Sequence, residues 1–166
     1  EKTILMIFTK VYLITLQMWR GKKKKKGPVR AKKTVVDGLS FSSGLEAYMY
    51  TALKNAEIQA KYEGETFELI HGFKFDNDVY ERCANSKGDY KNRGNKNIKN
   101  IKYTPDFVGE DFIIECKGRP NESFPIRWKL FKRYVQMYLP GFTIYKPQNQ
   151  KECDATINLI LSNKKQ

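Results

Sequence analysis

The stretch YTPDFVGEDFIIECKG, residues 103–118, constrains the fold of this chain more than any other. It predicts two short strands, 101–108 and 111–117, joined by a tight turn that contains a glycine. The second strand combines a run of apolar residues with charged residues at its end. We therefore expect a hairpin that is buried in a sheet and carries charged groups where it leaves the core.

The alternation of side chains along a strand assigns these residues to faces. Cys116 falls on the same face as the apolar residues and is expected in the core as a small hydrophobe. Glu115 and Lys117 share the opposite face, roughly 6 to 7 Å apart. Asp106, at the end of the preceding strand, lies close to that face if the two strands pair.

This pattern is suited to phosphodiester hydrolysis. The carboxylates of Asp106 and Glu115 can hold a divalent cation, with the backbone carbonyl of Cys116 as a further oxygen ligand. Lys117 can position the attacking water or offset charge in the transition state. The alternative is structural, because Pro-Asp is common in turns and Glu-x-Lys is a common ion pair on strands.

The charge balance favours a polyanionic partner. Lysine and arginine outnumber aspartate and glutamate by 31 to 18, a formal net charge of +13. Such an excess indicates DNA or RNA more than an anionic membrane, because each neutralised phosphate releases counterions. An apolar segment near the N-terminus is interrupted by a lysine and is short for a bilayer, so we expect no membrane partner.

Cysteine and histidine are too few for a zinc site or a disulfide framework. The three cysteines form no CxxC pair, and the single histidine excludes a multi-histidine site. The cysteines are expected as reduced thiols in a cytoplasmic compartment. A hydrolase built from this sequence therefore has to use carboxylates.

Periodicity predicts an α/β (α+β) fold with a mixed β-sheet flanked by helices, in the order α-β-β-β-α-β-α. An apolar N-terminal segment and a flexible basic arm are expected over 1–40, and the folded domain over 41–166. A polar basic loop is expected near 85–100. The other elements are helices at 43–56, at 125–139 and after Asn149, a strand-like region at 62–75, and a strand at 142–145.

Two motifs together carry a resemblance to a known family. FSSGLE, residues 41–46, at the start of the first helix, resembles the opening of the phage endonuclease I family of Holliday-junction resolvases. YTPDF followed by IIECKG resembles the PD-(D/E)xK nuclease signature. The resemblance covers residues 41–118 and implies a restriction-endonuclease-like core.

The resemblance also implies roles for individual residues. Asp106 and Glu115 would ligate Mg²⁺, with Mn²⁺ able to substitute, Lys117 would be the catalytic lysine, and Glu46 would complete the metal site. Glu46 has a second possible role, since Ser43-x-x-Glu46 is a capping box. A further acid of the family falls on Lys61 here; either Glu63 replaces it through a small shift, or the protein works without that group.

The resemblance further implies a homodimer that cuts branched DNA during recombination, in the host cytoplasm if the protein is viral. Two alternatives stay open. One is a PD-(D/E)xK nuclease for another DNA, of the restriction, nicking or repair type. The other is a non-catalytic DNA-binding derivative of the fold.

Basic residues in two segments are expected to contact DNA phosphates. On the helix at 125–139, three basic residues gather in one polar arc, while Arg127 falls in the apolar arc and needs a phosphate or carboxylate partner. The basic arm supplies a run of lysines. The residues assigned to DNA binding are Arg127, Lys129, Lys132, Arg133, Lys22, Lys23, Lys24, Lys25 and Lys26.

Overall fold

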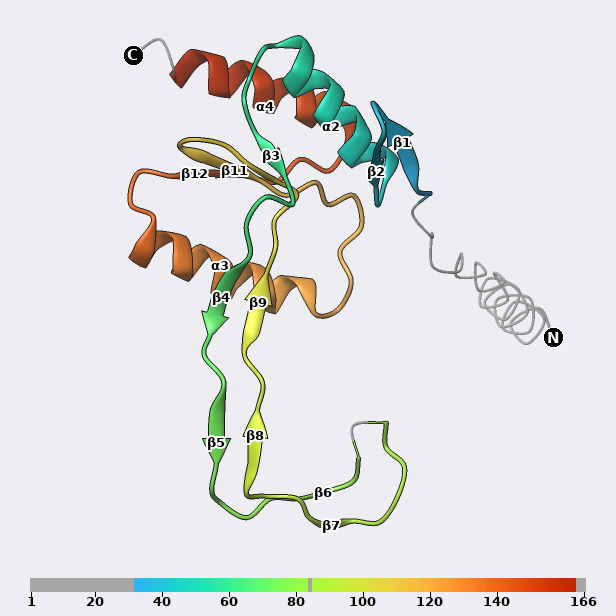
Figure 1. Ribbon diagram of the computed structural model, residues 1–166, viewed down its shortest axis with the longest axis vertical. Helices are drawn as coiled ribbons and strands as arrows, with labels where there is room; N and C mark the ends of the chain where they lie inside the picture. Colours follow the sequence, from blue (N-terminus) through green and yellow to red (C-terminus); the bar gives the residue numbers. More distant parts are fainter. Residues whose placement is uncertain (1–31, 84, 164–166) are drawn as a thin grey trace, which may run out of the picture. The chain divides into compact units, whose positions relative to one another are not determined.

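A computed structural model describes residues 32–83 and 85–163 (Figure 1). These residues form a mixed α+β fold with three helices and several small sheets. The lysines at positions 22–26, which were assigned to DNA binding, lie outside the described residues. Within the described part of the chain, no helix has the length and apolar character needed to cross a bilayer.

The central sheet has four strands in the order β12-β11-β10-β3. The strands are β3 (Lys61–Tyr62), β10 (Phe107–Val108), β11 (Phe112–Ile114) and β12 (Thr143–Tyr145). β10 pairs antiparallel with both β3 and β11, whereas β11 and β12 run parallel. The predicted hairpin is therefore present, and the sheet is mixed as expected.

The three helices are α2 (Gly44–Asn55), α3 (Phe124–Tyr138) and α4 (Gln150–Asn163). Each helix begins at a start signal in the sequence. Ser43 caps α2, and α3 has a proline in its first turn. Asn149 caps α4, because its Oδ1 accepts a hydrogen bond from the Glu152 N–H. The chain continues past α3 into Pro140 and Gly141, where the helix cannot extend.

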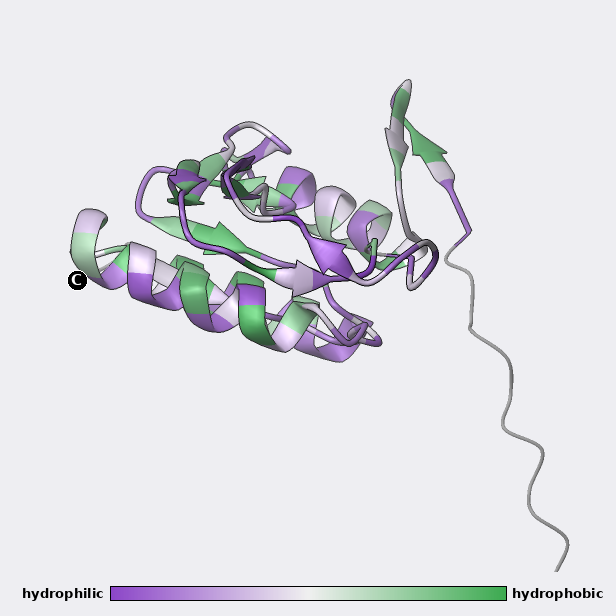
Figure 2. Ribbon diagram, turned by 90° about the horizontal axis from the view of Figure 1, so that it is seen from below, coloured by the Kyte–Doolittle hydropathy of each residue, from purple (hydrophilic) through white to green (hydrophobic). Residues whose placement is uncertain are grey.

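β11 separates two hydrophobic cores. Phe112 and Ile114 pack with residues of α2 and α4, while Ile113 packs with Phe131 and Val135 of α3. All three β11 residues are buried. In Figure 2 the strand between the helices is coloured as hydrophobic, whereas the helices alternate between polar and apolar residues, as expected of elements buried on one side only.

A hairpin precedes α2 within the residues that we expected to form a flexible arm. β1 (Thr34–Val36) and β2 (Leu39–Phe41) pair antiparallel across a turn at Asp37 and Gly38. Both turn residues have positive φ, 51° and 78°, which is the backbone of a type I′ turn. Phe41 is fully buried, so the folded domain begins before residue 41.

The predicted polar loop at 85–100 is instead half of a β-ribbon. β4 (Phe67–Ile70) pairs with β9 (Ile101–Tyr103), β5 (Phe73–Phe75) with β8 (Lys96–Ile98), and β6 (Tyr80–Glu81) with β7 (Lys91–Asn92). The three pairs are antiparallel and follow one another along the same two stretches of chain (Figure 1). The loop prediction was wrong for β7 and β8, because local polar composition does not report cross-strand pairing, whereas the other residues of 85–100 lie outside strands.

The apolar face of α3 is narrower than its sequence indicates. Phe124, Phe131 and Val135 are buried and Trp128 packs beside them, but Ile126, Met137 and Tyr138 are exposed. The helix therefore contacts the sheet along one stripe, and several of the large side chains expected in its core face point to solvent.

The turn between β10 and β11 is tight enough to require glycine. A Cβ at Gly109 would lie 2.3 Å from Cε1 and Cζ of the Phe112 ring, which is fully buried. Gly109→Ala should destabilise the fold by roughly 1 to 3 kcal/mol, because the Phe112 ring cannot move without disturbing the core. The free energy of unfolding is measured by urea titration with circular dichroism.

Gly44→Ala is the matched control. A Cβ at Gly44 would meet no atom within 4 Å, and the residue opens a helix. This variant should be as stable as the wild type or up to about 1 kcal/mol more stable. Equal stability of the two alanine variants would contradict the proposed role of the Gly109 turn.

Candidate active site at the end of the hairpin

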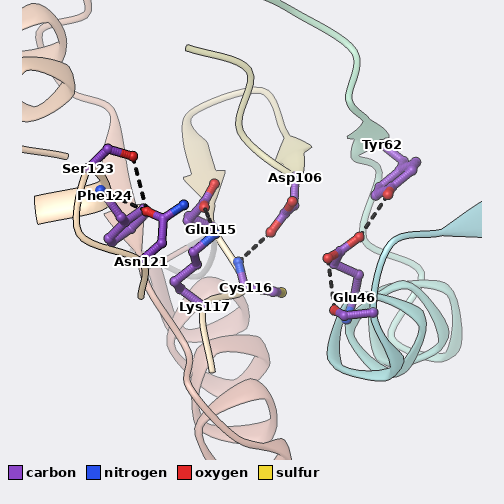
Figure 3. Close-up of polar contacts among 10 residues, drawn as sticks. Glu46, Tyr62, Asp106, Glu115, Cys116, Lys117, Asn121, Ser123 and Phe124 are labelled. Carbon is purple, nitrogen blue, oxygen red and sulfur yellow. Dashed lines mark hydrogen bonds and ion pairs between the residues drawn. The ribbon is translucent and has the colours of Figure 1, made fainter. Parts of the chain in front are cut away.

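The register of the β10–β11 hairpin brings the predicted acids together. Phe107 pairs with Ile114, and continuing this register by one residue places Asp106 opposite Glu115. The backbone of β11 continues beside β12 past its formal end, because Glu115 N–H donates to Tyr145 O and Lys117 N–H donates to Pro147 O. Asp106, Glu115 and Lys117 are thus held by backbone hydrogen bonds of the central sheet, and Figure 3 shows how their side chains lie.

Direct contacts fix the orientation of these side chains. Asp106 Oδ2 accepts a hydrogen bond from the Cys116 backbone N–H at 2.6 Å. Lys117 Nζ lies 3.8 Å from Glu115 Oε1 and 5.0 Å from the centre of the Phe124 ring. Cys116 is buried in the core as predicted, so Glu115 and Lys117 do share the face opposite to it.

Glu46 reaches the same region from the first turn of α2. Its Oε2 accepts hydrogen bonds from Tyr62 Oη at 2.8 Å and from Ser42 N–H at 3.0 Å. Its Oε1 accepts one from Ser43 Oγ at 2.8 Å, and Ser43 Oγ in turn accepts the Glu46 N–H. The capping role is therefore present, and Glu46 is also buried, with an exposed fraction of 6%.

Two of the three carboxylates, those of Glu46 and Glu115, are buried, and that of Asp106 is half-buried; burial affects their pKa values. It raises the pKa of Asp106 to about 8, with further contributions from the carboxylates of Glu115 and Glu46. Burial also raises the pKa of Glu115, and this effect is opposed by the Tyr103 hydroxyl and by Lys117. Negative charge on this cluster is costly unless a cation compensates it.

The donor set fits a hard divalent cation, although the carboxylates are not arranged around one point. Across residues 32–83 and 85–163, no three side chains of histidine, cysteine, aspartate or glutamate form a group that could hold a metal ion. Yet Glu46, Asp106 and Glu115 supply carboxylate oxygens, the ligand type that Mg²⁺ prefers. Glu46 and Glu115 are buried, and the pKa of Asp106 is raised. The chemistry of the side chains therefore suits a magnesium ion.

The backbone of Glu63 lies beside that of Asp106. Its N–H donates to Asp106 O at 2.8 Å, so the two residues are neighbours across β3 and β10. Lys61 pairs with Val108, two residues farther along the ladder, and its side chain is exposed. The side chain of Glu63 is exposed too, so this backbone contact alone does not assign the family's further acid to Glu63.

Arg127 lies beside the site without pairing to a carboxylate. Its Nη2 donates to Lys102 O at 2.6 Å, and its guanidinium carbon lies 5.7 Å from the centre of the Tyr103 ring. Within the described residues it forms no ion pair within 4.0 Å. Its partner in the structure is the Lys102 backbone carbonyl, and the side chain is exposed and not buried as its place in the apolar arc predicted, so contact with a phosphate stays a prediction.

The other predicted DNA-binding residues of α3 are where the helical pattern placed them. Lys129, Lys132 and Arg133 are all exposed on this helix.

All three cysteines are free thiols, of which Cys116 and Cys153 are buried and Cys83 is exposed. The prediction of unpaired cysteines is therefore confirmed.

Two tyrosines of the site were missed by sequence reasoning. Tyr62 binds Glu46, and Tyr103 has a buried hydroxyl with no hydrogen-bond partner among the described residues. Burial and the nearby Glu115 carboxylate raise the pKa of Tyr103. The only available signal was the position of each tyrosine at the end of a strand near a candidate acid.

The raised pKa of Asp106 predicts how stability depends on pH. The folded chain retains a proton up to about pH 8, whereas an unfolded aspartate releases it near roughly pH 3.9. Stability in EDTA should therefore fall between these values as the pH rises, by up to about 1.4 kcal/mol per pH unit. Asp106→Asn should flatten this dependence and be more stable than the wild type above pH 8.

The measurement is the free energy of unfolding between pH 4 and pH 9 with the metal chelated. Asp111→Asn is the control, because Asp111 is exposed and lies in the same hairpin. It should behave as the wild type does. A wild-type pH dependence in Asp106→Asn would show that Asp106 is not the group responsible.

Comparison with known proteins places the chain in a family. Residues 25–151 match the family described as "Protein of unknown function (DUF1064)", which is more than half of the chain. A search of curated proteins and a search of solved structures each found no significant match. From the extent of the family match, this chain belongs to the DUF1064 family.

Proposed function

We propose that this protein is a metal-dependent DNA endonuclease of the PD-(D/E)xK type. The observation that carries the proposal is the meeting of Asp106, Glu115 and Lys117 at the end of one hairpin, with Glu46 beside them. The structural alternative, an ion pair on the strand, explains only why Glu115 and Lys117 lie together. It does not account for the buried Glu46 or for the half-buried Asp106, whose pKa is raised.

The order of elements around the site supports a restriction-endonuclease-like core. Without the ribbon and the first hairpin, the chain runs α2-β3-β10-β11-α3-β12-α4, which is the expected order α-β-β-β-α-β-α. The acids sit at the ends of β10 and β11, in the middle of the mixed sheet. This position places them between α2 on one side and the start of α3 on the other.

The residues have separable chemical roles in this proposal. Glu46, Asp106, Glu115 and the Cys116 carbonyl would hold Mg²⁺, which when bound polarises a phosphoryl oxygen and acidifies a water molecule. The Cys116 N–H orients the Asp106 carboxylate, and Tyr62 orients that of Glu46. Lys117, partly exposed beside Glu115, can donate to the scissile phosphate or to the attacking water.

Branched DNA is the substrate that we propose, on the basis of the FSSGLE and YTPDF…IIECKG motifs. Paired cuts in a four-way junction require two active sites, so we propose a homodimer. Met137 and Tyr138, two large apolar side chains exposed near the end of α3, are candidates for contact with a second copy. The net charge of +13 supports binding to DNA in general and does not distinguish a junction from a duplex.

The first test compares a labelled four-way junction with a linear duplex of the same sequence, each with Mg²⁺ and with EDTA. We expect paired cuts in the junction that require metal. Glu115→Gln should abolish cutting, and Lys117→Ala should slow it at least about 100-fold, because each removes a group that acts on the reacting phosphate. Both variants should keep their affinity for DNA.

Controls distinguish the alternatives. Glu110→Gln, an exposed acid in the same hairpin, should cut at the wild-type rate. Equal cutting of junction and duplex would retain the nuclease and reject the junction specificity. Tight binding without cutting in Mg²⁺ or Mn²⁺ would support the non-catalytic DNA-binding derivative instead.

Arg127 is expected to contact a DNA phosphate. Its side chain is exposed and is already held over Tyr103 near Glu115. Arg127→Ala should therefore weaken DNA binding about 10-fold. It should also make the slope of log Kd against log salt shallower by about 1, the amount expected for one phosphate contact. Lys151→Ala, an exposed lysine of α4, is the control. Unchanged affinity, cleavage and stability in Arg127→Ala would refute this role.

A further inference from the structure

The outer part of the β-ribbon, residues 71–100, is a surface that the proposed catalytic chemistry does not use. It comprises the pairs β5–β8 and β6–β7, and it extends from the β4–β9 pair that packs on α3 (Figure 1). Its side chains are mostly exposed. A long insertion of this kind within a compact domain calls for a binding role.

The charge of the ribbon is positive, and three of its four acids already have side-chain partners. Residues 71–100 contain seven lysines and arginines and four acids. Glu81 pairs with Lys96 at 2.5 Å, Asp76 with Lys74 at 2.9 Å, and Asp78 accepts from Asn92 Nδ2 at 2.6 Å. Arg82, Lys87, Lys91 and Lys99 form no ion pair within the described residues.

Two tyrosines stand out on the far part of the ribbon. Tyr80 and Tyr90 are 57% and 68% exposed, and their ring centres lie 6.2 Å apart. Paired tyrosines on a basic β-surface offer flat faces on which unpaired bases can stack. Neither ring contributes to either of the hydrophobic cores.

A hollow in the same part of the ribbon is lined by basic groups. Its lining is Glu81, Arg82, Cys83, Asn92, Arg93 and Lys96. Arg93 is held in place, because its Nε donates to Glu81 O at 3.1 Å and its backbone N–H donates to Val79 O at 2.7 Å. Three cations around one hollow favour an anion the size of a phosphate.

The apolar residues of the ribbon are explained by its own stability. Phe73 lies directly opposite Ile98, and Phe75 lies opposite Lys96. Such cross-strand pairs stabilise an isolated two-stranded ribbon, which is otherwise marginal in water. They do not by themselves call for a protein partner.

The ribbon is also connected to the candidate active site. β9 ends at Tyr103, three residues before Asp106, and Lys96 lies seven residues farther along the same strand path. From Lys96 to Asp106 the path is thus ten residues, which at about 3.3 Å per residue spans at most about 33 Å, or roughly ten base pairs of duplex. DNA cut at Asp106 would therefore have its flanking phosphates within reach of the ribbon.

We propose that the ribbon is a second DNA-binding surface that grips the nucleic acid flanking the cut. Arg82, Lys87, Lys91 and Lys99 contact the phosphates, and Tyr80 and Tyr90 stack on unpaired bases. This inference rests on the proposed DNA nuclease, and it adds a contact surface separate from the carboxylate site.

The test measures DNA affinity as a function of salt in a Glu115→Gln background, which prevents cutting. The triple variant Arg82→Ala/Lys87→Ala/Lys91→Ala should bind about 10-fold or more weakly, with a slope of log Kd against log salt that is shallower by about 2 to 3. This loss should vanish on junctions whose arms are much shorter than about ten base pairs. Lys151→Ala, on α4, should bind as the background does.

The tyrosines have a distinct signature. Tyr80→Ala/Tyr90→Ala should lose about 5- to 100-fold in affinity for DNA with unpaired bases and nothing for a fully paired duplex. Tyr80→Phe/Tyr90→Phe, which keeps the aromatic rings, should bind such DNA as tightly as the chain with both tyrosines does. Circular dichroism and thermal unfolding verify that every variant is folded.

Two outcomes overturn the proposal. The first is wild-type affinity and slope in the triple variant. The second is a change from dimer to monomer in sedimentation with unchanged affinity per protomer, which would make the ribbon an interface between copies. Failure of the nuclease proposal is separate, since it appears as absence of cutting by the wild-type chain whatever the ribbon variants bind.

Discussion

Burial of β11 on both faces determines where the charged residues that follow it can lie. Phe112 and Ile114 belong to the core between α2 and α4, and Ile113 belongs to the core under α3. A strand held from both sides cannot slip in register without moving every one of these side chains to the wrong core. Glu115 and Lys117 inherit this rigidity, because their backbone N–H groups continue the ladder to Tyr145 and Pro147. A charged site built on this strand is preorganised by packing.

The rigid backbone keeps three carboxylates in one region of the fold, although the repulsion between their charges favours their separation. Glu46, Asp106 and Glu115 come from different elements, and burial with mutual repulsion raises the pKa of Asp106 to about 8. The fold offsets part of the cost with local donors, namely the Cys116 N–H for Asp106 and the Tyr62 hydroxyl for Glu46. Places where a sequence retains such a conflict are where function is expected, since a purely structural site gains nothing from it.

The sequence predicted the parts of the fold that depend on local signals. Helix α2 with its Ser43 cap and the hairpin that brings Asp106 to Glu115 both follow from periodicity and turn chemistry. The ribbon was missed because its strands are two or three residues long and rich in lysine and asparagine, so they show no alternation. Asp37 and Gly38 did carry a turn signal, which fits the observed hairpin. Tyr62 and Glu63 could not be placed beside Phe107 and Asp106 of the neighbouring strand path, because pairing over more than 40 residues leaves no local trace.

The short link between ribbon and site has a mechanical consequence. Only Thr104 and Pro105 separate the end of β9 from Asp106, and Pro105 is fully buried. A proline has a fixed φ, and a buried one has no room to move, so this link behaves as a stiff joint. A two-stranded ribbon is marginally stable alone and gains order when it binds. With DNA held on the ribbon, the stiff joint would fix the distance between the bound phosphates and the Asp106 carboxylate. The choice of the scissile bond would then depend on the geometry of the flanking DNA more than on its base sequence.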